Sequence, residues 1–296
     1  MEIRRIESPD DAALDPFRDV KDRQRRADGG RFLVESPRCV ARFLAAVDSG
    51  LFEIESLVAD PGTNSDLMDV AKGMGASVLA ADPEIITRAS GYRFHDGCLA
   101  LGVRPPRPRG VDQLTDSHDS KPGSREVLVV LAGVTSMDNI GGIFRSVAAL
   151  GAHGVVLDHA CADPLLRRCI RISMGQVFRV DWATTSSLPD QLHRWRDEHA
   201  FTSIALENHP DARLLTRFAR DGGEDGMGEA SPERVAVVIG NEGHGLTPEV
   251  MEACDTIRRI EGPPSLPDEE RPGASDERSL NASTAAAIAK HHLLHG

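Results

Sequence analysis

Three polar, glycine-rich segments in the second half of the chain carry residue types that suit ligand binding. They are Asn139-Ile-Gly-Gly-Ile-Phe-Arg145, Ile239-Gly-Asn-Glu-Gly-His-Gly-Leu246 and Ser279-Leu-Asn-Ala-Ser283. Glycine lets the backbone approach a ligand closely, and the start of a helix offers free N–H groups to an anion. Each segment comes just after a predicted strand, and ligands gather at such positions in open α/β sheets.

Each segment also has a purely structural explanation. The first can be a glycine-rich turn with a surface arginine, the second a tight strand-to-helix connection, and the third a helix cap. The second segment is not a GxGxxG fingerprint and lacks the P-loop lysine, so a nucleotide-cofactor oxidoreductase is disfavoured. Four polar residues at the start of the last helix exceed what capping requires.

Alternating strands and helices must position these segments. Unbroken apolar runs such as Val127–Ala132 are typical of strands covered on both faces of a parallel sheet. Further strands are predicted at 155–157, 178–182, 203–206, 235–239 and 256–260, and helices at 140–150, 167–174, 188–199, 248–254 and 282–294. We therefore predict an α/β domain with a mostly parallel sheet.

The first half predicts a smaller α/β unit. Strands are expected at 32–35, 54–59, 78–80 and 97–103, with helices at 37–47 and 67–74. The Ser36 hydroxyl is expected to cap the helix that Pro37 begins. The charged residues 1–30 predict a helix with a solvated face. Residues 106–125 are Pro-rich and polar and predict a linker, which gives domains at 1–105 and 126–296.

The order and spacing of the three segments resemble the SpoU (TrmH-like) family of SPOUT RNA 2′-O-ribose methyltransferases. The three segments match the three family motifs in order, and Arg171-Ile-Ser-Met-Gly175 is similar to an intermediate family segment. The likeness covers roughly residues 126–296. Phe32–Arg38 and Gly97–Leu101 look like the family's substrate-binding domain, which resembles a ribosomal-protein-type RNA-binding fold.

The resemblance implies a C-terminal α/β knot with a deep trefoil crossing and S-adenosyl-methionine as the methyl donor. It also implies a homodimer, with the donor pocket near the dimer interface. The implied reaction is 2′-O-methylation of structured RNA, with ribosomal RNA favoured by family analogy. The alternatives are a transfer RNA 2′-O-methyltransferase and a non-catalytic RNA-binding or assembly protein that kept the fold.

The resemblance also assigns residue roles. Arg145 is the expected catalytic residue, and it would position the weakly nucleophilic 2′-hydroxyl together with an RNA phosphate. Asn139 and Asn281 would orient the substrate or Arg145, while Glu242 and Ser279 would hold the site together. Donor contacts are expected from Gly240, Asn241, Gly243, Ile260, Leu280 and Ser283.

RNA binding must come from local charge, because the chain carries a formal net charge of −12. Arginines concentrate in two groups, namely 23, 25, 26, 31, 38 and 42, and then 167, 168 and 171. From these groups we expect Arg31, Arg38 and Arg171 to contact RNA.

Two features depart from the family pattern. Glu261 stands where the family usually has proline after the residue that matches Ile260. The acidic loop at 261–277 is also longer than usual. The loop is either a bulge outside the knot, which we favour, or a gate for the donor.

The cysteines and the apolar runs limit the setting of the protein. Five scattered cysteines form no CxxC pair, so neither a metal site nor a disulfide framework is expected. The N-terminus lacks an apolar signal core, and no apolar run is long enough for a bilayer. We expect reduced thiols in a cytoplasmic protein without a membrane partner.

Overall fold

The computed structural model describes residues 2–18, 30–91, 97–104, 110–116, 125–215, 232–261 and 280–295. Contacts divide the chain into two compact units. The first unit contains Met1–Pro108 together with Asp163–Arg179, and the second contains Arg109–Ala162 and Val180–Gly296. A segment from the middle of the chain therefore packs with the N-terminal residues.

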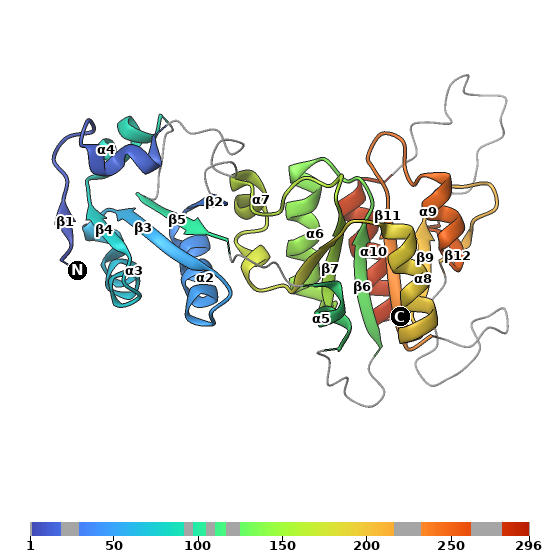
Figure 1. Cartoon of the computed structure of the whole chain (residues 1–296). Helices are drawn as coiled ribbons and strands as arrows, with labels where there is room; N and C mark the ends of the chain where they lie inside the picture. The colour runs from blue at the N-terminus through green and yellow to red at the C-terminus, as the bar shows by residue number, and fades with distance from the viewer. Residues whose placement is uncertain are drawn as a thin grey trace, which may run out of the picture. The chain divides into compact units, whose positions relative to one another are not determined.

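The first unit is a mixed five-stranded sheet in the order β1-β4-β3-β5-β2 (Figure 1). β5 runs antiparallel to β3 and β2, while β1, β4 and β3 are parallel. Helices α2 and α3 cover one face, and α4 with the 3₁₀ helix η1 covers the other. Its elements are β1 (Arg4–Arg5), η1 (Ala12–Phe17), β2 (Arg31–Glu35), α2 (Pro37–Asp48), β3 (Glu53–Ala59), α3 (Pro61–Gly73), β4 (Ser77–Ala80), α4 (Pro83–Ser90), β5 (Cys98–Val103), α7 (Arg167–Ile172) and η2 (Gln176–Phe178).

The inserted segment Asp163–Arg179 joins this unit through aromatic packing and hydrogen bonds. The ring of Phe178 lies 5.2 Å from that of Phe43 and 5.9 Å from that of Phe32, centroid to centroid. The Arg42 guanidinium donates a hydrogen bond to the Met174 carbonyl. Aromatic contacts of this kind contribute stability beyond the area they bury.

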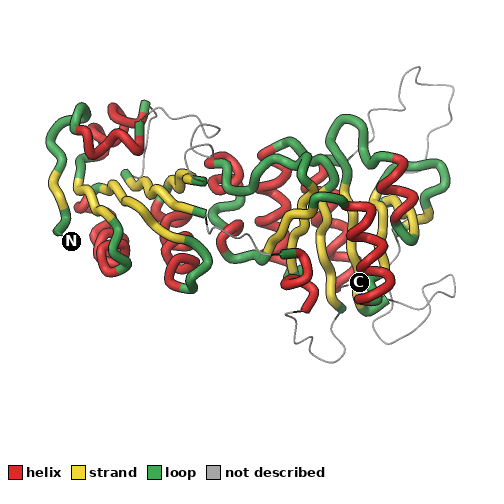
Figure 2. The backbone as a smooth tube through the Cα atoms, viewed as in Figure 1, coloured by secondary structure: helices red, strands yellow, loops and turns green. Residues whose placement is uncertain are grey.

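The second unit is a seven-stranded sheet in the order β10-β12-β9-β11-β6-β7-β8. All of its described strand pairs are parallel, as the sequence predicted for this half. Helices and strands alternate along most of this unit, with β9, β10 and β11 following one another among the described elements (Figure 2). Its elements are α5 (Val111–Asp116), β6 (Glu126–Leu131), α6 (Met137–Leu150), β7 (Gly154–Asp158), β8 (Trp182–Thr185), α8 (Leu188–His199), β9 (Thr202–Leu206), β10 (Arg213–Leu214), β11 (Arg234–Ile239), α9 (Pro248–Ala253), β12 (Thr256–Arg259) and α10 (Ala282–His295).

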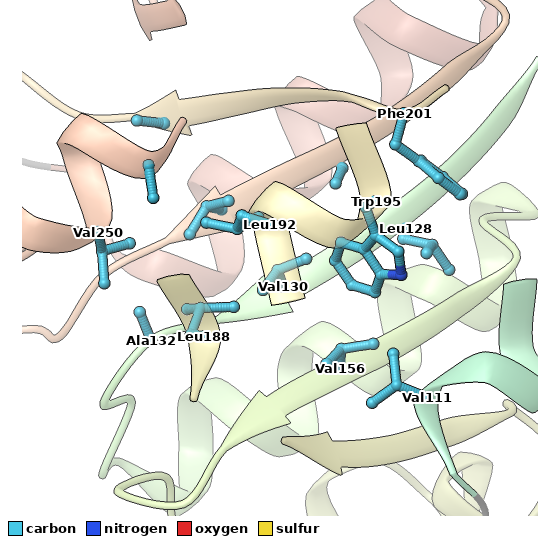
Figure 3. Close-up of a cluster of buried hydrophobic side chains, with 14 of the residues drawn as sticks. Val111, Leu128, Val130, Ala132, Val156, Leu188, Leu192, Trp195, Phe201 and Val250 are labelled. Atoms are coloured by element: carbon cyan, nitrogen blue, oxygen red, sulfur yellow. The ribbon is translucent and has the colours of Figure 1, made fainter. Parts of the chain in front are cut away.

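Helices cover both faces of this sheet, which explains its continuous apolar strands. On one face, α5, α8 and α9 pack on alternate strand residues such as Leu128 and Val130, with Trp195 at the centre (Figure 3). On the other face, α6 and α10 lie side by side against β6, β7 and β11. In the segment predicted as a linker, residues 111–116 form α5, and Val111 is buried in the core.

Three local predictions are wrong. In the described part of residues 1–30, a short strand and η1 replace the expected helix, because Ile6, Leu14 and Phe17 are buried in the core. Ser36 precedes α2, but its side chain makes no capping bond and its φ is 76°. The strand predicted at 178–182 begins only at its last residue, as β8 (Trp182–Thr185), since Phe178 ends η2 and packs in the aromatic cluster of the first unit.

Lys290 is fully buried between α10 and α6 and donates a 2.6 Å hydrogen bond to the Ser146 hydroxyl. Burial lowers the pKa of Lys290 to about 7, because a charged amine is poorly solvated there. Between pH 7 and about 10.4, the Lys290 amine is protonated in the unfolded chain and mostly deprotonated in the folded chain. The free energy of unfolding attributable to Lys290 should therefore rise with pH across that window.

We expect Lys290→Met to be more stable than the wild type at pH 7. Its advantage in free energy of unfolding should shrink by about 2 kcal/mol between pH 7 and pH 9. Denaturant unfolding at both pH values measures this change. Lys72→Met, at an exposed position of α3, is the control and should show no such change. An advantage that is constant or grows with pH would contradict the prediction.

Candidate active site

Several loops of the second unit meet at the carboxyl edge of its sheet, because the strands are parallel. The register sets Ile239 of β11 opposite Leu131 of β6 and Leu206 of β9. The residues that follow these three strand ends therefore lie next to one another. This edge is where open α/β sheets place their ligands.

The loop after β11 is a closed turn that depends on glycine. Asn241 and Gly245 exchange two backbone hydrogen bonds of 3.1 and 3.0 Å. Gly245 has a φ of +69°, and a Cβ added to Gly240 would lie 2.3 Å from the Gly245 carbonyl carbon. The Asn241 amide donates a 2.7 Å bond to the Gly133 carbonyl, while its carbonyl oxygen accepts the Gly243 N–H. These bonds fix the loop beside the end of β6.

Glu242 reaches from this loop to the start of α6. Its carboxylate accepts the backbone N–H of Ser136 at 3.0 Å and the side-chain amide of Asn139 at 2.9 Å. A third bond comes from the backbone N–H of Thr135 at 3.3 Å. Partial burial raises the pKa of Glu242, but the hydrogen bonds from Asn139 and the backbone outweigh it, and the net pKa is lowered. Glu242 is therefore ionised at neutral pH.

Asn139 links Glu242 to the third motif by hydrogen bonds. It is 5% exposed, and its side-chain oxygen accepts a 2.7 Å bond from the Asn281 amide. The Asn281 oxygen in turn accepts the Ser283 hydroxyl at 2.7 Å and backbone N–H at 2.9 Å. A Cβ on Gly142 would lie 2.9 Å from the Ser283 Cβ, so α6 and α10 approach closely here. One chain of hydrogen bonds therefore joins all three sequence motifs.

Arg145 lies outside this chain of bonds. It is exposed on α6, six residues beyond Asn139, which places the two side chains about 120° apart around the helix axis. Within the ranges that the structure describes, its guanidinium forms no ion pair. The side chain is therefore available to an anion from outside the unit.

The remaining donor-contact candidates border the same edge. Ile260 follows β12 and is half-buried, and Leu280 precedes α10 with 47% of its surface exposed. An exposed leucine at this place offers apolar surface to a ligand. Ser279 and most of the acidic loop at 261–277 lie outside the described residues.

The predicted RNA-binding arginines all belong to the first unit. Arg31 pairs with Glu55 at 2.6 Å, and Arg38 is exposed on α2. Glu35 pairs with both Arg171, at 3.4 Å, and Arg167, at 3.1 Å. The structure thus gathers members of both arginine groups into one unit, although about 130 residues separate Glu35 from its partners. Arg23, Arg25 and Arg26 lie outside the described residues.

Neither a metal cluster nor a membrane span is found in the described ranges. No group of three or more His, Cys, Asp or Glu side chains there is arranged to hold a metal ion. No helix there has the length and apolar character needed to cross a membrane.

Sequence reasoning missed several residues that build the edge. Ser136 caps α6 through a 3.3 Å bond from the Asn139 N–H, and Asp158 accepts the Gly133 N–H at 2.9 Å. A serine three residues before Asn139 is an N-cap signal that the sequence carries. Glu207, directly after β9, accepts the Leu246 N–H at 2.9 Å. Its only signal is the position of an acid immediately after a strand.

Comparison with known proteins gives consistent matches. A family model described as the SpoU rRNA Methylase family matches residues 126–291. A protein of Mycobacterium tuberculosis, named as an uncharacterised tRNA/rRNA methyltransferase, is 33% identical over 293 residues, which cover 98% of this chain and 91% of that protein.

Two solved structures share the fold. An AdoMet-bound rRNA methyltransferase from Sinorhizobium meliloti has a TM-score of 0.74 at 21% identity, with 98% of this chain and 97% of that chain covered. An RNA 2′-O ribose methyltransferase has a TM-score of 0.69 at 24% identity, with 98% of each chain covered. The α/β fold and the resemblance inferred from the three motifs are confirmed. The chain belongs to the SpoU rRNA methylase family.

Proposed function

We propose that this protein transfers a methyl group from S-adenosyl-methionine to a ribose 2′-hydroxyl of structured RNA, with ribosomal RNA as the preferred class. The observation that carries the proposal is the hydrogen-bond chain from Glu242 through Asn139 to Asn281. It unites the three motifs at the ligand-binding edge of the sheet. Relatives and structural neighbours that are named as RNA methyltransferases support the same reaction class.

The edge of the sheet fits a donor of this kind. Gly243 exposes backbone without a side chain in the Gly240–Leu246 loop, and Leu280 offers apolar surface. The residues that would hold the donor are Gly240, Asn241, Gly243, Ile260, Leu280 and Ser283. When bound, S-adenosyl-methionine supplies an electrophilic methyl group on a sulfonium. The S. meliloti neighbour binds AdoMet on the same fold, which supports this choice of donor.

Arg145 would act on the substrate side. Because arginine stays charged at neutral pH, its role is to bind and position rather than to accept a proton. Its exposed guanidinium suits a bidentate contact with an RNA phosphate, which would place the 2′-hydroxyl in line with the methyl group. Asn139 and Asn281 would keep the start of α6 in the geometry that presents Arg145. Glu242 and Ser279 would hold the site together.

The first unit would supply the RNA-binding surface. Arg38 and Arg171 are exposed there, and Arg31 is half-buried beside Glu55. The Glu35 carboxylate fixes Arg171 and Arg167 to the edge strand β2. Preordered guanidinium groups lose less side-chain entropy on binding phosphate than mobile ones. The net charge of −12 makes such a local surface necessary.

Arg171→Ala should weaken RNA binding in a salt-dependent way. We expect the slope of log affinity against log salt concentration to fall by about one, because one phosphate contact is lost. Filter binding of ribosomal RNA measures the slope, at salt concentrations from about 50 to about 300 mM that bracket physiological ionic strength. The control is Arg5→Ala, which removes an exposed arginine of β1 that pairs with Asp82. Its slope should equal that of the wild type. Equal slopes for Arg171→Ala and wild type would remove Arg171 from the interface.

The function itself is tested by methyl transfer in vitro. Purified protein, tritiated S-adenosyl-methionine and either ribosomal or transfer RNA should yield alkali-resistant 2′-O-methylated dinucleotides from ribosomal RNA. Label only in transfer RNA would establish the alternative substrate. Donor binding without label in either RNA, or no donor binding, would favour a non-catalytic RNA-binding or assembly protein. Mapping 2′-O-methyl sites in cells with and without the protein would identify the nucleotide.

The homodimer, the trefoil knot and the cytoplasmic location stay predictions that rest on the family resemblance. Sedimentation equilibrium tests the homodimer directly. A monomer that retained full methyl transfer would contradict the expectation that the donor pocket lies near a dimer interface.

A further inference from the structure

Glu207 sits at the carboxyl edge of the sheet but belongs to none of the three motifs. It follows β9 directly, and its backbone N–H donates a 3.0 Å bond to the Arg258 carbonyl of β12. The strand on the other side of β9 is β11, which leads into the Gly240–Leu246 loop. Glu207 is therefore placed between two strands whose ends border the proposed donor site.

The Glu207 carboxylate holds the far end of that loop. One oxygen, Oε2, accepts the Leu246 N–H at 2.9 Å, and Oε1 accepts the N–H of Asn208 at 3.0 Å. The carboxylate also fills the space beside Gly245, where an added Cβ would lie 2.3 Å from Oε2. Gly245 has a positive φ, so this contact is made at the residue where the loop reverses.

The near end of the loop is anchored separately. Asn241 bonds to the Gly133 carbonyl, and Glu242 bonds to Ser136 and Asn139. These bonds tie the loop toward β6 and α6. In the described part of the unit, Glu207 is the side chain that ties the Gly245–Leu246 end toward β9. The loop is thus held from two opposite sides by acidic and amide side chains.

We infer that Glu207 is a positioning residue for the methyl-donor loop, an inference that rests on the proposed function. Without its carboxylate, the Leu246 N–H loses its acceptor and the turn at Gly245 loses the group that packs against it. The loop then spends less time in the binding-competent conformation. Apparent donor affinity falls in proportion to that population, even though Glu207 need not touch the donor.

The test is equilibrium binding of S-adenosyl-methionine and of S-adenosyl-homocysteine by calorimetry. We expect Glu207→Ala to weaken both ligands by the same factor, about tenfold or more, since a hydrogen bond to a charged acceptor is lost. Glu207→Gln keeps an oxygen for the Leu246 N–H and should bind within about threefold of wild type. At saturating donor, kcat of Glu207→Ala should stay within about twofold of wild type, because a loss of ground-state donor binding raises KM.

Asp211→Ala is the matched control, because it removes a carboxylate four residues along the same connection. The Asp211 side chain is 88% exposed, and its carboxylate lies 3.6 Å from the His209 ring nitrogen Nδ1. It should bind both ligands like wild type. Thermal unfolding without ligand should show that all variants remain folded.

Two results would overturn the inference. One is wild-type donor affinity in Glu207→Ala. The other is a loss confined to S-adenosyl-methionine, since a carboxylate that acts on the sulfonium directly would spare S-adenosyl-homocysteine, whose thioether sulfur is uncharged. Failure of the wild-type protein to bind either ligand would instead count against the proposed function, so the two failures are distinguishable.

Discussion

Replacing Arg145 with alanine is expected to lower kcat/KM for RNA methylation by at least about a hundredfold, because a charged group acting in the transition state is lost. Affinity for S-adenosyl-methionine should change by less than about twofold, since no hydrogen bond of the Gly240–Leu246 loop in the described residues involves Arg145. The guanidinium is exposed on α6, while the Gly240–Leu246 loop is held by Asn241, Glu242 and Glu207. Single-turnover methylation and calorimetric donor binding measure the two quantities.

Two further variants sharpen this experiment. Arg145→Lys keeps the charge but loses the planar bidentate geometry, so its activity should fall between those of wild type and Arg145→Ala. Arg194→Ala removes an exposed arginine of α8 that pairs with Asp112 and Glu198, and it should methylate RNA normally. If Arg145→Ala retained wild-type methylation, Arg145 would have no catalytic role.

Replacing Glu242 with alanine should damage donor binding as well as methylation. The change leaves the Ser136 N–H, the Thr135 N–H and the Asn139 amide without their acceptor. Because Asn139 also accepts from Asn281, the start of α10 loses its alignment. We expect donor affinity to fall by more than about tenfold, since charge-assisted hydrogen bonds are the stronger kind. Calorimetry measures the affinity.

The pH dependence of the wild type gives an independent check on Glu242. Its pKa is lowered in the folded chain, so its stabilising contribution is present above the ordinary glutamate pKa and is lost as pH falls through the lowered value. Donor binding should therefore show no transition from Glu242 between pH 8 and about 5.

The control for Glu242→Ala is Glu249→Ala, in the first turn of α9, which should leave donor binding unchanged. Wild-type donor affinity in Glu242→Ala would exclude the network as a support for the site.

The two variants separate the halves of the proposed site. Arg145→Ala should lose rate and keep donor affinity, whereas Glu242→Ala should lose both. Such a split is the signature of a substrate-side residue next to a donor-side network.

Sequence patterns predicted the sheet of the second unit well, and for a physical reason. Runs such as Val235–Ile239 are apolar at every position, because helices cover both faces of the strand. The three motifs also predicted one site, because parallel strands bring their ends to one edge. What joins them is the bond between Asn139 and Asn281, which spans 142 positions and depends on the packing of α6 against α10. Local spacing carries no information about that contact.

Other features escaped prediction because tertiary contacts override local pattern. The helix of the first motif begins at Met137 rather than Ile140, since Ser136 caps it before the apolar residues start. Phe178 lies outside β8, which begins at Trp182, because its ring packs in the aromatic cluster of the first unit. In the sequence, Glu207 is a single acidic residue after a strand, and only the structure shows that its carboxylate accepts the Leu246 N–H.

The inclusion of Asp163–Arg179 in the first unit has a consequence for cutting the protein into fragments. The family match begins at residue 126, which makes that position an obvious place to truncate. A fragment ending there would lack Phe178 and leave Phe32 and Phe43 facing water. It would also leave the Glu35 carboxylate without its partners Arg167 and Arg171. The start of the family match is therefore not a boundary of autonomous folding, and a fragment made to test the proposed RNA-binding surface must include Asp163–Arg179 together with the N-terminal residues.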